Sequence, residues 1–357
     1  MTPNSPDLPI TITGIGSVSP YGPLAGLIPQ CPVESSAITA WTTAGLRRAF
    51  LVKPFRPASV VPGAKTRRLD RLSAWALVAS SLAIQDAGID LSQIDRSRVA
   101  VVFATAFGCV ELTEAFYQSA ATNGWSGTDP ITFPETLANA PASHVSLFHD
   151  LRGPNLTVSS KGFAGESALI QAASLLRHGQ ADLAVVIAGD TLTRAVYEWY
   201  EAADLLSPAC YNSEPLPEGC DFMPSEGVAA LVLEPLGRCE IRSEARSYAH
   251  FRSGRWAAGG QPVEIIRQML GGSVPSLTVC TGNGAPCASS PTAALAREIV
   301  GHAAAIVPPH AVAAGLVNTG ALLHLILALS ERPSSGQTLL LGSSGDSGFA
   351  ALLLELP

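Results

Sequence analysis

The chain has 357 residues and a formal net charge of −7, with 47% hydrophobic and 14% charged residues. This length exceeds what one hydrophobic core usually serves, so we expect two domains or two fused halves. The negative charge gives no basis for nucleic-acid binding. The longest apolar runs, such as 183–188, are too short to span a membrane. Seven cysteines, without CxxC spacing or a preceding secretory leader, indicate free thiols in a reducing cytosol.

Apolar runs separated by Gly and Pro predict alternating strands and helices. A first strand over 10–13 ends at Gly14, and a segment over 20–65 that is rich in Pro, Gly and Ser runs over the surface. The other expected strands are 99–104, 156–159, 183–189, 228–233, 277–280, 338–341 and 348–354. The expected helices are 72–87, 111–121, 166–178, 292–300 and 321–329. This alternation is typical of a layered α/β fold with a mostly parallel sheet.

The stretch 151–165, LRGPNLTVSSKGFAG, predicts a strand, a sharp turn and the start of a helix. An enzyme can present a nucleophile at such a turn, because the N-terminus of the following helix favours an anionic attacking atom. Here the turn contains Gly162, which has no side chain to attack with. The frame of a nucleophile turn is therefore present without its reactive group.

This stretch resembles the nucleophile segment of the β-ketoacyl synthases, which condense acyl chains on carrier proteins. Their pattern is Gly-Pro, a short apolar strand and Thr-Ala-Cys-x-x-Gly; here Gly153, Pro154 and Gly165 match, and Gly162 replaces the cysteine. Further motifs extend the resemblance along nearly the whole chain, namely 12–22, 68–71, 86–88, 178–182, 226–227 and 230–234. The resemblance implies a thiolase-like layered αβαβα fold built from two related halves, which we place at 1–236 and 237–357.

In active members of that family two histidines polarise the thioester carbonyl as carbon dioxide leaves. The His-Gly-Thr-x-Thr-Pro segment matches a segment that starts at Thr281, so a threonine stands at the first histidine position. The second histidine position matches Val312, and His310 close by is the alternative, a displaced histidine. The resemblance thus implies no catalytic residue, since Gly162, Thr281 and Val312 are all degenerate positions. It implies no metal and no cofactor.

Residues next to the turn allow more than one interpretation. Lys161 stands where the family has a small alanine. It either fills the space that the cysteine left, or pairs with Glu166, or faces solvent or a subunit interface. Cys280 either lines the old site or is an ordinary buried residue. The hydroxyls nearest to the turn are candidate substitute nucleophiles without an evident base: Ser159, Ser160 and Ser167.

Chain-length factors are synthase-like proteins that lack the nucleophile and pair with an active synthase, and this chain resembles one. In the family the strand before the nucleophile pairs with its copy in a second subunit, and we expect 154–159 to do so here. Bulky residues on segments that approach the tunnel end in relatives either shape the acyl chain or simply pack in the core. These tunnel or interface candidates are Phe107, Phe116, Tyr117, Phe133, Thr136 and Leu137.

The sequence therefore predicts a non-catalytic ketosynthase-like subunit in fatty acid, polyketide or polyene biosynthesis, located in the cytoplasm. Its expected partners are an active ketosynthase subunit, in a heterodimer or alternatively a homodimer, and an acyl carrier protein that is reached through the complex. Two alternatives stay open. One is an acyl-thioester enzyme with a serine or Cys280 as substitute nucleophile, and the other is a homodimeric acyl-binding scaffold.

Overall fold

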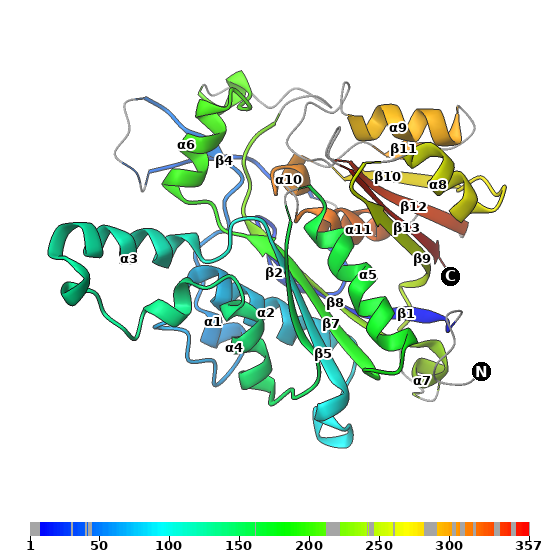
Figure 1. Ribbon diagram of the computed structural model, residues 1–357, viewed down its shortest axis with the longest axis horizontal. Helices are drawn as coiled ribbons and strands as arrows, with labels where there is room; N and C mark the ends of the chain where they lie inside the picture. Colours follow the sequence, from blue (N-terminus) through cyan, green and yellow to red (C-terminus); the bar gives the residue numbers. More distant parts are fainter. Residues whose placement is uncertain are drawn as a thin grey trace.

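The computed structural model describes residues 8–29, 31–39, 41, 45–160, 162–211, 222–240, 242, 246–259, 261–281, 291–301, 305–307, 311–316, 319–331, 336–343 and 348–356 (Figure 1). The strands are β1 (Ile10–Ser19), β2 (Gly22–Ala25), β3 (Ser36–Ala37), β4 (Arg48–Ala49), β5 (Val99–Thr105), β6 (Asn155–Ser159), β7 (Leu183–Asp190), β8 (Gly227–Pro235), β9 (Ala249–Ala257), β10 (Leu277–Thr281), β11 (Ala305–Val307), β12 (Gly336–Ser343) and β13 (Phe349–Leu356). The α-helices are α1 (Pro57–Val60), α2 (Arg71–Asp86), α3 (Val110–Asn123), α4 (Ala140–His149), α5 (Ala164–Arg177), α6 (Arg194–Ala202), α7 (Leu236–Glu240), α8 (Pro262–Leu270), α9 (Pro291–Val300), α10 (Ala311–Ala314) and α11 (Ala321–Ser330).

One strand order occurs twice in the hydrogen-bonded sheet. The full order is β11-β10-β12-β13-β9-β1-β8-β7-β5-β6, with β2 beside β1. The first half has the order β6-β5-β7-β8-β1, and the second half has the order β11-β10-β12-β13-β9. Numbered along the chain within each half, both orders are third, second, fourth, fifth, first. In each half the fifth strand, β8 or β13, is antiparallel to both of its neighbours. The remaining strand pairs within each half are parallel. Strand β1 pairs with both β8 and β9 and so joins the two halves. The predicted boundary after residue 236 falls within the first turn of α7 and stays a prediction.

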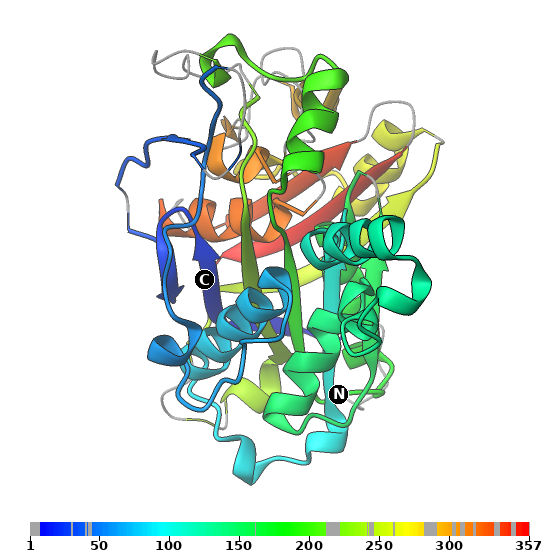
Figure 2. The same ribbon diagram turned by 90° about the vertical axis from the view of Figure 1, so that its left-hand side faces the viewer.

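Five layers are visible when the helices are added (Figures 1 and 2). Helices α5 and α11 lie between the strands of the first half and those of the second, and contact both. Helices α2 and α4 pack on the outer face of the first half, whereas α8 and α9 pack on the outer face of the second. The predicted thiolase-like αβαβα fold is therefore confirmed.

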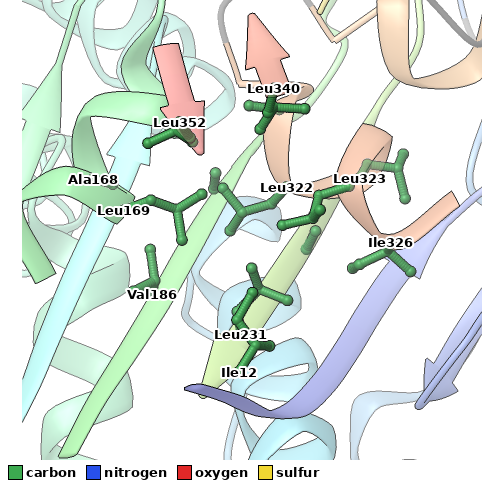
Figure 3. Close-up of a cluster of buried hydrophobic side chains, with 14 of the residues drawn as sticks. Ile12, Ala168, Leu169, Val186, Leu231, Leu322, Leu323, Ile326, Leu340 and Leu352 are labelled. Atoms are coloured by element: carbon green, nitrogen blue, oxygen red, sulfur yellow. The ribbon is translucent and has the colours of Figure 1, made fainter. Parts of the chain in front are cut away.

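The central layer is the main hydrophobic core (Figure 3). Side chains from both halves meet there around α5 and α11, including Ile12, Val186, Leu231, Leu169, Leu322, Ile326, Leu340 and Leu352. Helix α11 carries the sequence ALLHLILALS, which is buried along almost its whole length. A helix that is apolar on all sides fits an interior position, which is why this segment becomes the middle of the sandwich.

Strand β1 corrects the sequence-based prediction that the first strand ends at Gly14. It continues to Ser19, with an irregularity in its pairing to β8 between Ile12 and Gly14. A side chain on Gly14 would overlap the backbone of α2 at Ala83, and one on Gly16 would overlap it at Ala79. The glycines are thus needed for close approach of α2 to the sheet, and they do not end the strand.

The segment 20–65 is also less open than predicted. It contains β2, β3, β4 and α1, and its residues Phe50 and Val52 are buried. The backbone of Phe50 bonds to the loop before β8, since its N–H donates to the carbonyl of Pro224. Further elements that the sequence did not indicate are α4, α6, α7, β9, α8, β11 and α10. Within the described ranges, every helix is too short or too polar to traverse a bilayer.

Candidate functional site

The turn between β6 and α5 contains Gly162 in an unusual backbone conformation. Its φ is +139°, in the region that L-residues with a side chain rarely adopt. Phe163 follows with φ −157° and ψ 47° and is buried, and α5 starts at Ala164. The sharp strand–turn–helix that the sequence predicted is present, and glycine relieves the strain at its centre. Lys161, the predicted site-filling residue, lies outside the described residues.

Next to this turn is a carboxyl group that the sequence-based prediction did not include in the site. Glu166, in the first turn of α5, is only 1% exposed. The Thr281 hydroxyl at the end of β10 lies 2.5 Å from Glu166 Oε1 and 3.2 Å from the carbonyl oxygen of Leu341. Burial raises the pKa of Glu166 to about 7, although Thr281 and the backbone amide of Glu166 lower it. Thr281, at the predicted first histidine position, is therefore part of a buried polar contact.

Val312, the predicted second histidine position, lies on α10 and is 1% exposed. It belongs to the central hydrophobic cluster together with Ala313 and Leu316. His310, the alternative for a displaced histidine, lies outside the described residues. Cys280 is fully buried and Ser167 nearly so. No disulfide joins the five cysteines that the structure describes, and within those residues no cluster of His, Cys, Asp and Glu could hold a metal ion.

A second buried carboxyl, Asp190, lies at the end of β7. It accepts hydrogen bonds from the Thr105 hydroxyl at 2.5 Å and from the N–H groups of Ala106 and Phe107. Burial raises the pKa of Asp190 to about 6 despite these donors. Asp190 therefore fixes the loop that leads from β5 to α3. In the sequence Asp190 could have been noticed as a lone acid at the end of an apolar strand. Open α/β sheets often place functional groups at this position.

The six tunnel or interface candidates fall into two groups in space. Phe107 packs edge-on against Trp199 and Tyr200 of α6. The other five lie on α3 and on the short 3₁₀ helix η4 (Phe133–Thr136) with its next residue, an arm that projects from the sheet (Figure 1). There the Phe116 ring contacts the rings of Tyr117 and Phe133. Thr113 donates a hydrogen bond to the carbonyl of Thr136, and Leu137 is 43% exposed.

The stretch 117–156 exposes an unusual amount of apolar surface. Strand β6 is an edge strand of the sheet, and most of its side chains are partly or fully accessible. More than half of the exposed large apolar side chains among the described residues belong to this stretch: Tyr117, Trp125, Ile131, Phe133, Leu137, Leu147, Phe148 and Leu156. An apolar patch beside an open strand edge is typical of a protein–protein interface.

A second surface is strongly basic, although the chain is acidic overall. Residues 47–71 include one acid, Asp70, and eight cationic side chains. Five of these are exposed, and the structure gives none of the five an ion pair with another described residue: Lys53, Arg56, Lys65, Arg67 and Arg68. Such a run of solvated cations favours an anionic partner.

Comparison with known proteins identifies the architecture. The family model "Beta-ketoacyl synthase, N-terminal domain" matches residues 37–238. The 3-oxoacyl-[acyl-carrier-protein] synthase 2 of Vibrio cholerae is 27% identical over 257 residues, which cover 67% of this chain and 61% of that enzyme. The chain thus spans about three fifths of the length of the curated relatives that it matches.

Two solved structures resemble nearly the whole chain. One is a type II polyketide acyl-carrier protein in complex with its ketosynthase, with a TM-score of 0.76, 18% identity, and coverage of 98% of this chain and 100% of that chain. The other is the ishigamide ketosynthase/chain length factor, with a TM-score of 0.71, 22% identity, and coverage of 98% and 99%. At these identities the likeness establishes a common fold.

Proposed function

Because the chain belongs to the β-ketoacyl synthase family, we propose that it is a non-catalytic, chain-length-factor-type subunit. In this proposal it pairs with an active ketosynthase in fatty acid, polyketide or polyene biosynthesis and shapes the partner's acyl tunnel. The observation that carries the proposal is Gly162, which lies in the nucleophile turn of a fully formed fold and offers no attacking atom. A thiolate is needed there to take up the acyl chain.

The two histidine positions support the same proposal. Thr281 donates or accepts hydrogen bonds through a hydroxyl that already contacts Glu166 and Leu341. Val312 has an apolar side chain within the core. Loss of one oxyanion donor costs an enzyme roughly a hundredfold in rate. Loss of both donors and of the nucleophile would leave no useful condensation.

Pairing with a ketosynthase is supported by the open edge at β6. Its backbone N–H and C=O groups on one side have no neighbouring strand in the described chain, and the apolar side chains of 117–156 surround it. A second thiolase-like chain that adds its own edge strand would cover both features. One solved relative is a ketosynthase/chain length factor, so we favour a heterodimer over a homodimeric scaffold.

A carrier protein is the second proposed partner. The basic surface of residues 47–71 suits an acidic protein, and another solved relative is an acyl-carrier protein bound to its ketosynthase. We place the complex in the cytoplasm, with the fatty acid synthases that it resembles. A substitute thiol nucleophile is not favoured, because Cys280 is fully buried and burial raises the pKa of Cys109 to about 12.

Co-expression with an active ketosynthase, followed by product analysis, tests this function. We expect a stable heterodimer, and shorter side chains at the tunnel candidates should lengthen the product. Phe107→Ala and Phe116→Ala are the two informative variants, since their rings lie in separate clusters. Val274→Ala, at an exposed apolar position before β10, is the control. An unchanged product length in both variants would remove the tunnel-shaping role.

The pairing and the lack of catalysis need separate measurements. The chain purified alone should neither form an acyl adduct with acyl carrier protein nor release carbon dioxide from malonyl carrier protein. Intact mass detects the adduct, and trapped labelled carbon dioxide detects the decarboxylation. Either product would replace the proposal with the alternative of an acyl-thioester enzyme. A stable homodimer that does not bind the ketosynthase would instead support the alternative of a homodimeric acyl-binding scaffold.

A further inference from the structure

We infer that Glu166 is a protonated acid that closes the former reaction centre and ties the two halves of the fold together. This goes beyond the proposed function and does not rest on it, since neither a partner nor a product enters the argument. It concerns the chain alone, so its test can fail while pairing with a ketosynthase succeeds, and the reverse.

Three positions far apart in sequence build the place for this carboxyl. Thr281 and Gly342 lie opposite each other at the ends of the parallel strands β10 and β12. A side chain at Gly342 would overlap Glu166 Oε1 and come within 2.7 Å of the Thr281 hydroxyl. Glycine at 342 therefore leaves the space that the carboxyl occupies. The site is filled from α5 of one half and lined by two strands of the other.

Hydrogen-bond counting assigns the proton. The Thr281 hydroxyl contacts Glu166 Oε1 at 2.5 Å and the carbonyl oxygen of Leu341 at 3.2 Å. A hydroxyl has one proton to donate, and a backbone carbonyl can only accept. Both contacts are full two-centre hydrogen bonds only if the proton between Thr281 and Glu166 comes from the carboxyl; a carboxylate would have to share the single hydroxyl proton with Leu341. The chain of bonds then runs from the acid to the threonine and from the threonine to Leu341.

The surroundings favour this neutral form. Glu166 is 1% exposed, and an isolated buried carboxylate is costly. Helix α5 packs against β5, β6, β7, β8, β9, β13 and α11. The titratable side chains on these elements are Asp190 on β7, Glu234 on β8, His250, Arg252 and Arg255 on β9, Glu355 on β13 and His324 on α11, and β10 adds Cys280 beside Thr281. Among the described residues, no charged side chain shifts the pKa of Glu166; burial raises that pKa to about 7.

The acid consequently occupies the region where the family presents its first catalytic imidazole. With the carboxyl and the Thr281 hydroxyl bonded to each other and to Leu341, neither group is available to a thioester oxygen. The former reaction centre therefore lacks the family's reactive groups, and the hydrogen-bonded pair Glu166 and Thr281 occupies part of it. Ionisation of Glu166 would draw the Thr281 proton away from the Leu341 carbonyl and leave a buried charge at the contact between α5 and β10.

The first experiment compares the pH dependence of unfolding in the wild type and in Glu166→Gln, which has the same shape and no titration. The native pKa lies above that of an unfolded glutamate. The stabilisation is therefore complete below the unfolded pKa and is lost as the pH rises through about 7. Between pH 5 and 8 the urea midpoint of the wild type should fall relative to that of the glutamine variant.

The control is Glu264→Gln, which changes an acid on the outer helix α8 and should follow the wild type. Parallel curves for the wild type and Glu166→Gln would overturn the inference.

The second experiment stands even if Glu166→Gln folds poorly. Gly342→Ala places a methyl group against the carboxyl and should lower the urea midpoint. Glu166→Ala should also lower it, by leaving a cavity. In the double variant the new methyl group occupies part of that cavity, so its midpoint should lie above the sum of the two single effects. Strict additivity, or a Gly342→Ala variant as stable as the wild type, would show that the carboxyl does not occupy this space.

Discussion

Strand β6 and the turn that follows it are adjacent in sequence but differ in almost every physical respect. Residues 155–159 form an edge strand with accessible side chains, whereas Gly162, Phe163 and Glu166 are buried. The outer region keeps the features that another chain needs for pairing, an unpaired edge and an apolar border. In the inner region Gly162 has no side chain, and Glu166 is a buried acid that is bonded to Thr281. The difference agrees with the proposed subunit, in which the surface contacts are retained and the chemistry is not.

The largest expected effect is in the interior, at Asp190. Asp190→Ala removes the acceptor for the buried Thr105 hydroxyl and for two part-buried backbone N–H groups. Leaving such donors unpaired costs about 1–3 kcal/mol each, so we expect a loss of about 3–4 kcal/mol in the free energy of unfolding, measured by urea denaturation. Asp190→Asn, which keeps one acceptor oxygen, should lose much less. Equal losses for both variants would mean that the loop does not depend on these bonds.

The next largest effect tests the outer region. Leu156→Asp places a charge on the open strand, on a side chain that is 38% exposed. If β6 forms the interface, the dissociation constant of the dimer should rise about a hundredfold or more, as expected for a charge forced into an apolar contact. Sedimentation equilibrium measures the change. Val274→Asp, at an exposed apolar position before β10, is the control. If Leu156→Asp leaves the dimer unaffected, the interface lies elsewhere, and β6 does not differ from the turn in the way proposed here.

The basic surface should give a smaller and salt-sensitive effect. Reversal of three exposed cations, Lys65→Glu with Arg67→Glu and Arg68→Glu, should weaken binding of acyl carrier protein by about tenfold at low ionic strength. The difference should shrink as salt is added. Arg297→Glu on α9 is the single-site control, and titration calorimetry is the measurement. If the affinity for acyl carrier protein is the same in the wild type and in the triple variant, the carrier protein contacts the partner subunit alone.

The smallest predicted effect concerns His149 at the end of α4. Burial, with a contribution from Arg96, lowers the pKa of His149 to about 4. Its unfolded value is higher, so the stabilisation is present above about pH 6.5 and is lost as the pH falls toward 4. From pH 6.5 to 5.5 this group should cost about 1 kcal/mol of unfolding free energy. His149→Gln should show a flatter profile over that range, and an equal slope would rule out this origin.

Much of the fold follows from the sequence, because apolar runs mark buried strands and helices wherever they fall. The run 183–188 and the apolar helix α11 are examples, and the Gly-Pro and Gly-x-x-Gly pattern around Gly162 locates the turn. Strand β9 could not be found in this way, since AHFRSGRWA mixes charges with apolar residues on a strand buried only in part. Gly14 resembled a strand end because its real role, contact with α2, is a tertiary property.

The candidate site was predictable only as a set of missing groups. Motif spacing predicts Gly162, Thr281 and Val312 as the three positions that lack a catalytic side chain, and this stays a prediction. Glu166 could not be predicted, because an acid in the first turn of a helix is normally a surface residue that favours the helix dipole. Its burial depends on Thr281, 115 positions further along the chain, and on the absence of a side chain at Gly342. Both conditions come from strands of the other half.

The dual pairing of β1 also constrains how the chain reaches this fold. Ile10 lies opposite Pro235 on β8 and Phe251 on β9, so β1 leaves the ribosome long before these two partner strands are synthesised. Until they emerge, its apolar residues lack their native neighbours and are open to aggregation, a hazard for which cells supply chaperones. Once β1 is seated, it couples both halves. Neither half should therefore melt without the other, and a single cooperative transition is the expected calorimetric behaviour.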